Sequence, residues 1–182
     1  FNWLEGAGSQ AYSQALSRSN NALFIAGLFN TNREQTYAGN VSKLTGDIIL
    51  ALEKRKNTYL ENIVDAACGP LTVSVELERP TISIDMNRFQ MEYGIEEAED
   101  KGIVGNRCFL GDIGNLEKLV PFEDKSTNVF NPREDYEITE RIGEDSQDLV
   151  VSSLALDLLD TEGRYNFLRE SHRVLRDGKY LV

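Results

Sequence analysis

From residue 58 onward, short β-branched or apolar runs alternate with longer amphipathic segments, and this alternation narrows the choice of fold more than any other feature. The predicted strands lie at 59–65, 81–85, 107–112, 147–156 and 179–182. Segments with helical spacing, 86–102 and 162–178, separate neighbouring strands and end at glycines. Strands and helices that alternate in this way are typical of a sheet with helices on both faces. The sequence therefore predicts an α/β fold with a doubly wound, mostly parallel sheet.

The chain before this alternation has a different character. Residues 1–57 are interpreted as an N-terminal helical extension of the main domain, which spans 58–182. Within the extension, Leu44, Ile48 and Leu52 recur at four-residue spacing. That spacing predicts an amphipathic helix.

One segment interrupts the main domain. Residues 121–146 contain two of the four prolines and many acidic side chains. Polar segments of this length without periodicity are typical of solvated loops, so an acidic loop insertion is predicted. A short helix is expected just before it, at 114–120.

Charge and cysteine content limit the classes of partner and compartment. Acidic residues outnumber basic ones 30 to 19, for a formal net charge of −11, and no dense basic cluster offers phosphate contacts. Nucleic acid binding is therefore allowed but not indicated. Cys68 and Cys108 do not make a disulfide framework, and no apolar run is long enough to span a bilayer. We expect an intracellular protein of the cytoplasm or nucleus that does not enter a membrane.

Three aspartates follow three successive predicted strands: Asp65, Asp85 and Asp112. Ligands of open α/β sheets bind beyond the carboxyl ends of the strands, so these side chains are candidates for one site. Asp85 lies twenty residues beyond Asp65, which is the usual separation of a ribose-binding acid from the first loop. A carboxylate accepts two hydrogen bonds from a ribose diol. Turn formation and helix capping are the structural alternative for each aspartate.

Five segments carry a resemblance to a known family. They are IVDAACGPL, SIDMN, FLGDIGNL, SQDLVVSSLAL and FLRESHRVLRDGKYLV, in this order between residues 63 and 182. In order and spacing they resemble the motifs of class I S-adenosylmethionine-dependent methyltransferases. The resemblance implies a Rossmann-like domain, with its C-terminal strands missing, that binds S-adenosylmethionine and transfers its methyl group. The acceptor stays open among small molecules, RNA and proteins.

The resemblance also implies roles for residues at the strand ends. It places four of them near the methionine part of the cofactor: Asp65, Ala67, Cys68 and Gly69. It places four others against the ribose and adenine: Asp85, Met86, Asp112 and Ile113. Ser152 and Ser153 then face the transferred methyl group and the acceptor. Without the resemblance, Cys68 would be interpreted as a small buried residue, and the two serines would be interpreted as the end of a strand.

Several features bear on whether such a domain is an active enzyme. Methyl transfer needs alignment and exclusion of water rather than a catalytic triad, and none is seen. The single histidine, His172, is interpreted as a helix residue, and no metal site is expected. Two glycine positions of the first motif hold Ala67 and Leu71, which leaves open a catalytically inactive methyltransferase-like domain that serves as a binding or scaffold subunit. A Rossmann-type dehydrogenase is a third interpretation. The absence of the G-x-G-x-x-G motif after Val64 argues against it.

The last predicted strand, 179–182, stands at the edge of the expected sheet. The resemblance implies further strands beyond it. An uncovered sheet edge is prone to unwanted pairing, and proteins usually protect it. We therefore expect another polypeptide, or a C-terminal segment beyond the given sequence, to cover this strand.

Overall fold

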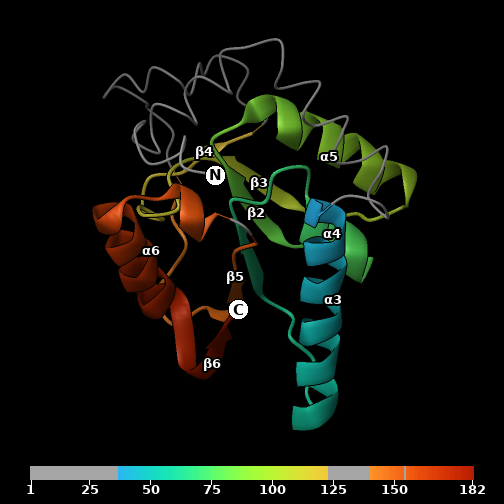
Figure 1. Cartoon of the computed structure of the whole chain (residues 1–182), viewed down its shortest axis with the longest axis horizontal. Helices are drawn as coiled ribbons and strands as arrows, with labels where there is room; N and C mark the ends of the chain where they lie inside the picture. Colours follow the sequence, from blue (N-terminus) through green and yellow to red (C-terminus); the bar gives the residue numbers. More distant parts are fainter. Residues whose placement is uncertain (1–36, 123–139, 154) are drawn as a thin grey trace.

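Six strands form one mixed sheet in the part of the chain that the structure describes. This computed structural model describes residues 37–122, 140–153 and 155–182. The strands are β1 (Ile63–Ala66), β2 (Ile82–Asp85), β3 (Arg107–Leu110), β4 (Val120–Pro121), β5 (Gln147–Val151) and β6 (Leu175–Leu181). They lie in the order β4-β3-β2-β1-β5-β6 (Figure 1). The predicted extension before residue 37 and most of the predicted insertion, 123–139, lie outside the described residues.

The sheet is wound in two directions from its centre. Every neighbouring pair of strands is parallel except β3 with β4, which is antiparallel. From β1 the chain moves outward through β2 and β3, and it later returns to place β5 and β6 on the other side. The order therefore reverses between β1 and β5, where sheets of this kind form their ligand-binding crevice. The predicted doubly wound, mostly parallel sheet is confirmed.

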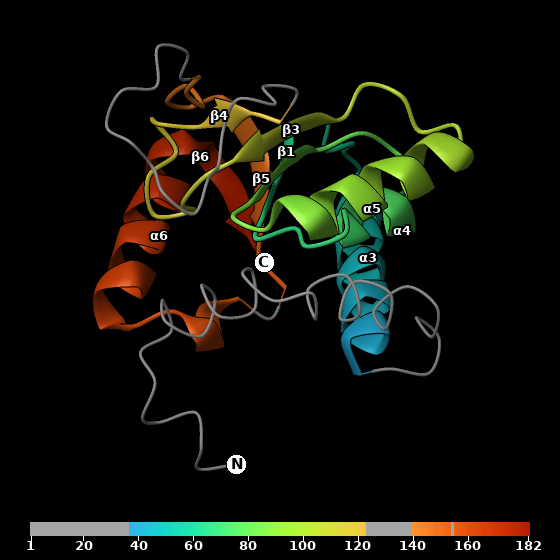
Figure 2. The ribbon, with the colours of Figure 1, turned by 90° about the horizontal axis from the view of Figure 1, so that it is seen from above.

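Helices cover both faces of the sheet (Figures 1 and 2). They are α3 (Tyr37–Lys56), α4 (Thr72–Leu77), α5 (Arg88–Asp100) and α6 (Thr161–Val174), with a 3-10 turn, η1 (Leu156–Leu158). On one face, Phe167 of α6 packs with Val64 of β1. On the other face, Ile49 of α3 packs with Ile63 of β1. In this part of the chain, no helix combines the length and the apolar character needed to cross a membrane.

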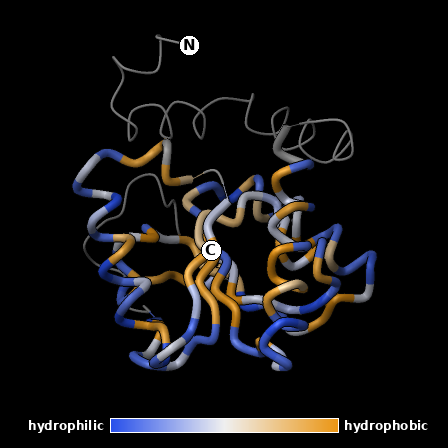
Figure 3. Tube along the Cα trace, turned by 60° about the horizontal axis from the view of Figure 1, so that its bottom comes forward, coloured by the Kyte–Doolittle hydropathy of each residue, from blue (hydrophilic) through white to orange (hydrophobic). Residues whose placement is uncertain are grey.

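The two central strands, β1 and β5, are buried along their whole length. Figure 3 shows hydrophobic colour running through the middle of the sheet, with hydrophilic colour toward the periphery. Strands covered on both faces need apolar side chains on both, which is why these segments are nearly continuous apolar runs. Asp65 is the exception in β1, because its carboxylate lies inside this core.

Helix α3 is present where the spacing predicts an amphipathic helix, but it packs through a different face. Of the three residues in the predicted apolar stripe, Leu44 and Ile48 are 57% and 43% exposed, and Leu52 is partly buried against the core. The buried face instead holds Thr45, Ile49 and Glu53. Only one of these three side chains is apolar, so hydrophobic periodicity alone does not identify the buried face.

The buried Glu53 explains this orientation of α3. Its Oε1 accepts the backbone N–H of Leu60 at 2.8 Å and pairs with Arg79 Nη1 at 2.9 Å. The Arg79 guanidinium also stacks over the Tyr59 ring, 4.6 Å from its centroid. Buried charges are tolerated where they are paired and hydrogen-bonded, and these partners come from other segments of the chain.

Segment 114–120 forms turns and a strand end, so the predicted helix there is wrong. Asp112 Oδ1 accepts the backbone N–H of Gly114 at 2.8 Å and starts a turn. Leu119 then exchanges two backbone hydrogen bonds with Glu140, and β4 follows. The backbone groups of this segment are therefore used in antiparallel pairing with residues distant in sequence.

Other boundaries also differ from the prediction: β1 begins at Ile63, β3 ends at Leu110 and β6 begins at Leu175. Strand β5 ends at Val151, earlier than predicted, and the chain continues into η1. Helix α6 ends at Val174 and not at Gly178. The next residue, Leu175, pairs in register with Gln147 of β5, so its backbone joins the sheet directly.

Candidate functional site

The carboxyl ends of four parallel strands meet along one edge of the sheet. Asp65 of β1 is in register with Val151 of β5, and Asp85 of β2 is in register with Leu110 of β3. Strands β1 and β2 are also paired. The ends of these four strands and the segments that follow them are therefore neighbours, and they hold all the residues to which a ligand role is assigned above.

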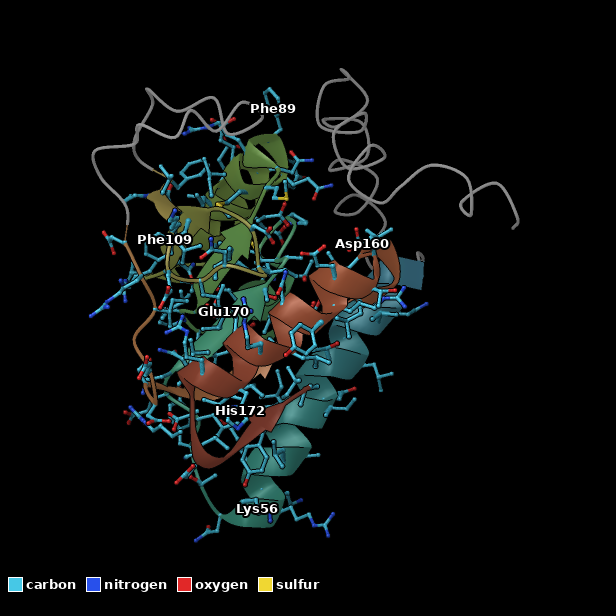
Figure 4. All side chains as sticks on the ribbon, turned by 90° about the vertical axis from the view of Figure 1, so that its left-hand side faces the viewer. Lys56, Phe89, Phe109, Asp160, Glu170 and His172 are labelled. Carbon is cyan, nitrogen blue, oxygen red and sulfur yellow. The ribbon has the colours of Figure 1, made fainter. Side chains whose placement is uncertain are left out.

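Figure 4 shows the end of the molecule that this edge occupies. Phe89 and Asp160, which mark the starts of α5 and α6, lie toward one end, and Lys56, the last residue of α3, lies at the other. Helix α5 begins just after β2, so its start marks the strand ends. His172 lies farther along α6, toward Lys56, and is exposed. The single histidine is thus remote from the strand ends.

The loop after β1 has left-handed backbone at every second residue. The angle φ is +59° at Ala67, +53° at Gly69 and +51° at Leu71. These are the three glycine positions of the methyltransferase motif that the loop resembles. Outside glycine, this conformation costs about 1–2 kcal/mol per residue, so the rest of the fold must hold Ala67 and Leu71 in place. The loop keeps the backbone course that glycines would permit, although two of them are absent.

Hydrogen bonds to β2 hold this loop. The backbone N–H of Cys68 donates to the carbonyl of Ile84 at 3.0 Å. The next N–H, of Gly69, donates to Oδ2 of Asp85 at 2.7 Å. Two consecutive amides of the loop are therefore anchored to the end of the neighbouring strand, one of them through a candidate ligand-binding side chain.

The side chain of Leu71 belongs to the core. It is fully buried and shares a cluster with Val75 of α4 and Met91 of α5. The strain of a leucine at positive φ is therefore offset by the burial of its side chain, which contributes about 1.5–3 kcal/mol. The methyl group of Ala67 packs against the cluster on the opposite face of the sheet.

Asp85 links the loop to α5. Its Oδ2 accepts the N–H of Gly69 and its Oδ1 accepts the N–H of Asn87, each at 2.7 Å. Burial raises the pKa of Asp85, while hydrogen bonds from the backbone of Asn87, Gly69 and Met86 oppose that rise. A carboxylate has about four lone-pair positions, so the bonds from the backbone do not exhaust its acceptor capacity. The remaining capacity suits a ligand hydroxyl group.

Asp65 is the buried carboxylate at the end of β1. It is 1% exposed, and its Oδ2 has no hydrogen-bond partner among the described residues. Burial raises the pKa of Asp65 to about 7, the backbone N–H of Val73 opposes this, and the charge of Asp85 adds to it. Near neutral pH the group is therefore divided between its neutral and charged forms. A buried oxygen without a partner is a candidate contact for a ligand that brings a donor or a cation.

Cys68 contributes backbone to the site and not a reactive thiol. Its side chain is 2% exposed, and burial, followed by the charges of Asp85 and Asp65, raises the pKa of the thiol well above its ordinary value. A protonated thiol is a poor nucleophile and a poor metal ligand. Within the ranges described, no group of three or more His, Cys, Asp or Glu side chains could hold a metal ion.

The other residues assigned to the nucleoside differ in exposure. Met86 is half-buried, and Asp112 is exposed with its Oδ1 bonded to the N–H of Gly114. Ile113 is 6% exposed and belongs to the same core cluster as Phe167 of α6. Met86 and Asp112 are thus accessible at the strand ends, whereas Ile113 mainly supports the core.

Two serines follow β5, and α3 reaches one of them. Ser153 Oγ lies 3.1 Å from Thr45 Oγ1. Because Thr45 Oγ1 donates its proton to the carbonyl of Val41 at 2.9 Å, Ser153 is the donor in this pair. Ser152 Oγ is buried and has no partner in the described segments. Sequence reasoning missed Thr45, since no local signal separates a threonine that faces the sheet from one that faces solvent.

Several solved structures with a similar arrangement of strands and helices are methyltransferases. A candidate S-adenosyl-L-methionine-dependent methyltransferase from Methanococcus maripaludis is 14% identical with a TM-score of 0.61, covering 88% of this chain and 61% of that protein. An S-adenosylmethionine-dependent methyltransferase from Clostridium acetobutylicum is 15% identical with a TM-score of 0.58, covering 89% and 56%. The magnesium protoporphyrin IX methyltransferase of Synechocystis, solved with bound SAM, is 12% identical with a TM-score of 0.61, covering 92% and 72%.

These likenesses lie in the fold and not in the sequence. No protein-family model and no curated protein sequence matches the chain. The chain spans 61% and 56% of the first two structures, so it corresponds to a little over half of each. The resemblance carried by the five motifs is confirmed at this level: the chain has the fold of the class I S-adenosylmethionine-dependent methyltransferases.

Proposed function

We propose that this chain is the cofactor-binding part of an S-adenosylmethionine-dependent methyltransferase. The observation that carries the proposal is the left-handed backbone at all three glycine positions of the first loop, which the Gly69 N–H joins to Asp85. A loop that keeps this course without two of its glycines is held there by the rest of the fold. The shared fold, including a relative solved with bound SAM, supports the same reading.

The nucleoside half of the cofactor would lie over β2 and β3. Asp85 has acceptor capacity left for a ribose hydroxyl, and Met86 follows it directly with a half-buried side chain suited to an adenine face. Asp112 lies two residues beyond the end of β3, the next strand outward, and would contact the adenine edge. In this proposal the ribose would lie over β2 and the adenine over β3.

The methionine half would lie over β1. When bound, S-adenosylmethionine supplies an electrophilic methyl group on a positively charged sulfur. The unpartnered oxygen of Asp65, together with the charge of Asp85, favours a cationic ligand at this edge. Binding of a cation would also favour the charged form of Asp65 and so release its proton.

The methyl acceptor would approach over β5. Ser152 and Ser153 follow that strand, on the side of β1 that is opposite to Asp85. Methyl transfer depends on alignment and on exclusion of water, so hydroxyl groups that orient an acceptor are sufficient there. We assign these two serines to the acceptor side of the site.

The alternative of an inactive scaffold domain rests on Ala67 and Leu71. Both residues hold the conformation that the motif requires, and the leucine side chain lies in the core. These departures therefore no longer favour loss of cofactor binding.

Calorimetry with S-adenosylmethionine tests the proposal. We expect saturable binding to the unmodified protein, and Asp85→Ala to weaken it by on the order of tenfold or more, because the ribose loses its acceptor. Asp177→Ala is the matched control, since Asp177 is an exposed aspartate on β6 and its removal leaves the strand ends intact. Absence of binding in a folded sample, or equal weakening by both variants, would contradict the proposal.

We also propose that a further strand covers the free edge of β6, supplied by another polypeptide or by a C-terminal continuation. Among the described strands, β6 pairs only with β5, and Leu181 near its end is 42% exposed. Sedimentation equilibrium of the unmodified chain and of Leu181→Lys tests whether a second copy supplies the strand. If a second copy supplies the strand, the unmodified chain should form a concentration-dependent dimer and Leu181→Lys should abolish it. If a different segment covers the edge, both samples should be monomers.

A further inference from the structure

Helix α5 lies directly on the loop after β1 because Gly94 has no side chain. A Cβ at Gly94 would lie 2.3 Å from the carbonyl carbon of Pro70, 2.6 Å from its oxygen and 2.8 Å from the backbone nitrogen of Leu71. Real Cβ atoms essentially never come within 3.0 Å of such neighbours. The obstructing atoms are backbone, which cannot rotate aside as the end of a side chain can. Any larger residue at this position must push the helix and the loop apart.

Two other residues of α5 reach the same loop. Met91 is fully buried in one cluster with Leu71 and Cys68. The side-chain oxygen of Gln90 lies 3.3 Å from the position that a Cβ would take at Gly69. One face of α5 therefore meets the loop at three points, and the glycine is the point of closest approach.

The start of α5 also fixes Asp85. Asn87 caps the helix, because its side chain accepts the N–H of Gln90. Its own N–H donates to Asp85 Oδ1, while the N–H of Gly69 donates to Asp85 Oδ2. The loop, the aspartate and the helix thus form a closed set of contacts, in which the position of α5 affects the hydrogen bond between the loop and the aspartate.

We propose that Gly94 is a positioning residue of the cofactor site. By letting the backbone of Pro70 and Leu71 lie against α5, it sets the separation at which the Gly69 N–H reaches the Asp85 carboxylate. It acts through the loop and touches no ligand. The inference rests on the proposed function for its role in cofactor binding, while its structural part concerns the Gly69–Asp85 bond alone.

The test is Gly94→Ala, followed by two readouts on a folded sample well below its unfolding temperature. The first is the amide proton resonance of Gly69 in nuclear magnetic resonance spectra. In the unmodified protein it should lie downfield and follow the ionisation of Asp85, because a charge-assisted hydrogen bond joins them. In the variant it should move upfield and lose this pH dependence. The second readout is the dissociation constant of S-adenosylhomocysteine, which should rise on the order of tenfold.

Gly46→Ala is the matched control, since Gly46 is also a helix glycine but a Cβ there would meet its nearest atom at an ordinary 3.4 Å. It should change neither readout. Unchanged readouts in Gly94→Ala would overturn the inference. Should that variant not fold, the unmodified protein decides: a strong nuclear Overhauser effect between the Gly94 Hα protons and the Leu71 amide proton supports the contact, and its absence overturns it. A protein that binds no S-adenosylhomocysteine, but whose Gly69 resonance responds to Gly94→Ala, would contradict the proposed function and retain the structural inference.

Discussion

The backbone N–H of Gly69 lies 2.7 Å from Oδ2 of Asp85, so the loop after β1 is tied to the side chain at the end of β2. A hydrogen bond to a charged group contributes about 1.5–3 kcal/mol, and removal of the acceptor leaves the amide without a partner. The geometry of the loop and the availability of the aspartate are therefore not independent properties.

Asp85→Asn should separate charge from shape. Asparagine replaces one of the two carboxylate oxygens by an NH2 group, which cannot accept from the N–H of Gly69 or Asn87, so we expect a loss of about 1–2 kcal/mol in the free energy of unfolding. Denaturation by urea measures this loss. Asp112→Asn is the matched control, because Asp112 is exposed beyond the next strand. An equal loss in both variants would contradict the conclusion that Asp85 holds the loop through its two hydrogen bonds.

Asp65 should make stability fall as pH rises toward neutrality. Burial raises its pKa from 3.8 to about 7 in the folded chain, so the folded state binds the proton more tightly than the unfolded state. The stabilising contribution of protonated Asp65 is fully present below pH 3.8 and is lost progressively up to about pH 7, by up to about 4 kcal/mol. Asp65→Asn keeps the size without the charge. Urea denaturation at several pH values should show a slope in the unmodified protein that the variant lacks; parallel curves would refute the assignment.

Asp148 should show the opposite dependence. Burial tends to raise its pKa, but hydrogen bonds from Lys179 and from the backbone and side chain of Asn62 outweigh this and lower the pKa to about 2. Its stabilising effect is therefore present above pH 3.8 and lost as pH falls through about 2.

We expect Asp148→Asn to lower stability at neutral pH by about 1–2 kcal/mol, a value reduced for the solvent that screens its partner Arg176, 44% exposed. Chemical denaturation at neutral and acidic pH checks this. A difference between the variant and the unmodified protein that persists at the acidic end would argue against the ion pairs.

The two left-handed residues should respond differently to glycine. Ala67→Gly removes the conformational strain at the loss of one methyl group, so stability should stay equal or increase by up to about 1 kcal/mol. Leu71→Gly removes the same strain but also a fully buried leucine side chain, and it should lower stability by about 2 kcal/mol or more. Thermal unfolding of both variants tests the contrast. Equal effects would mean that the leucine contributes nothing to the core.

Thr45→Val tests the contact between α3 and the end of β5. Valine preserves the shape but removes the acceptor for Ser153, and we expect a loss of about 1 kcal/mol. Thr45→Ser keeps the hydroxyl and should recover most of that loss. Thr81→Val is a matched control, because Thr81 and Ser83 form a similar hydroxyl pair at 2.8 Å on β2. If Thr45→Val leaves the stability unchanged, the hydroxyl pair with Ser153 contributes nothing and the prediction is wrong.

The positions of the strand ends follow from the sequence, because parallel strands place their carboxyl ends together. An aspartate after each β-branched run, as at Asp65 and Asp85, is therefore enough to predict a shared edge. The local conformation of the loop does not follow in the same way. Alanine and leucine rarely adopt positive φ, and contacts from other elements, among them β2 and α5, hold Ala67 and Leu71 there.

The wrong predictions share one cause, which is that partners distant in the chain decide the local structure. Glu53 turns α3 toward the sheet because Leu60 and Arg79 supply hydrogen bonds to its carboxylate. Leu119 leaves the predicted helix because Glu140 offers a backbone partner. Periodicity in a short window carries no information about either contact.

The left-handed residues at 67 and 71 have a kinetic consequence. Their strain is overcome when the chain folds, so the loop has its final shape before any molecule arrives. We therefore expect a ligand to bind without rearrangement of the loop, so that diffusion and charge would set its association rate.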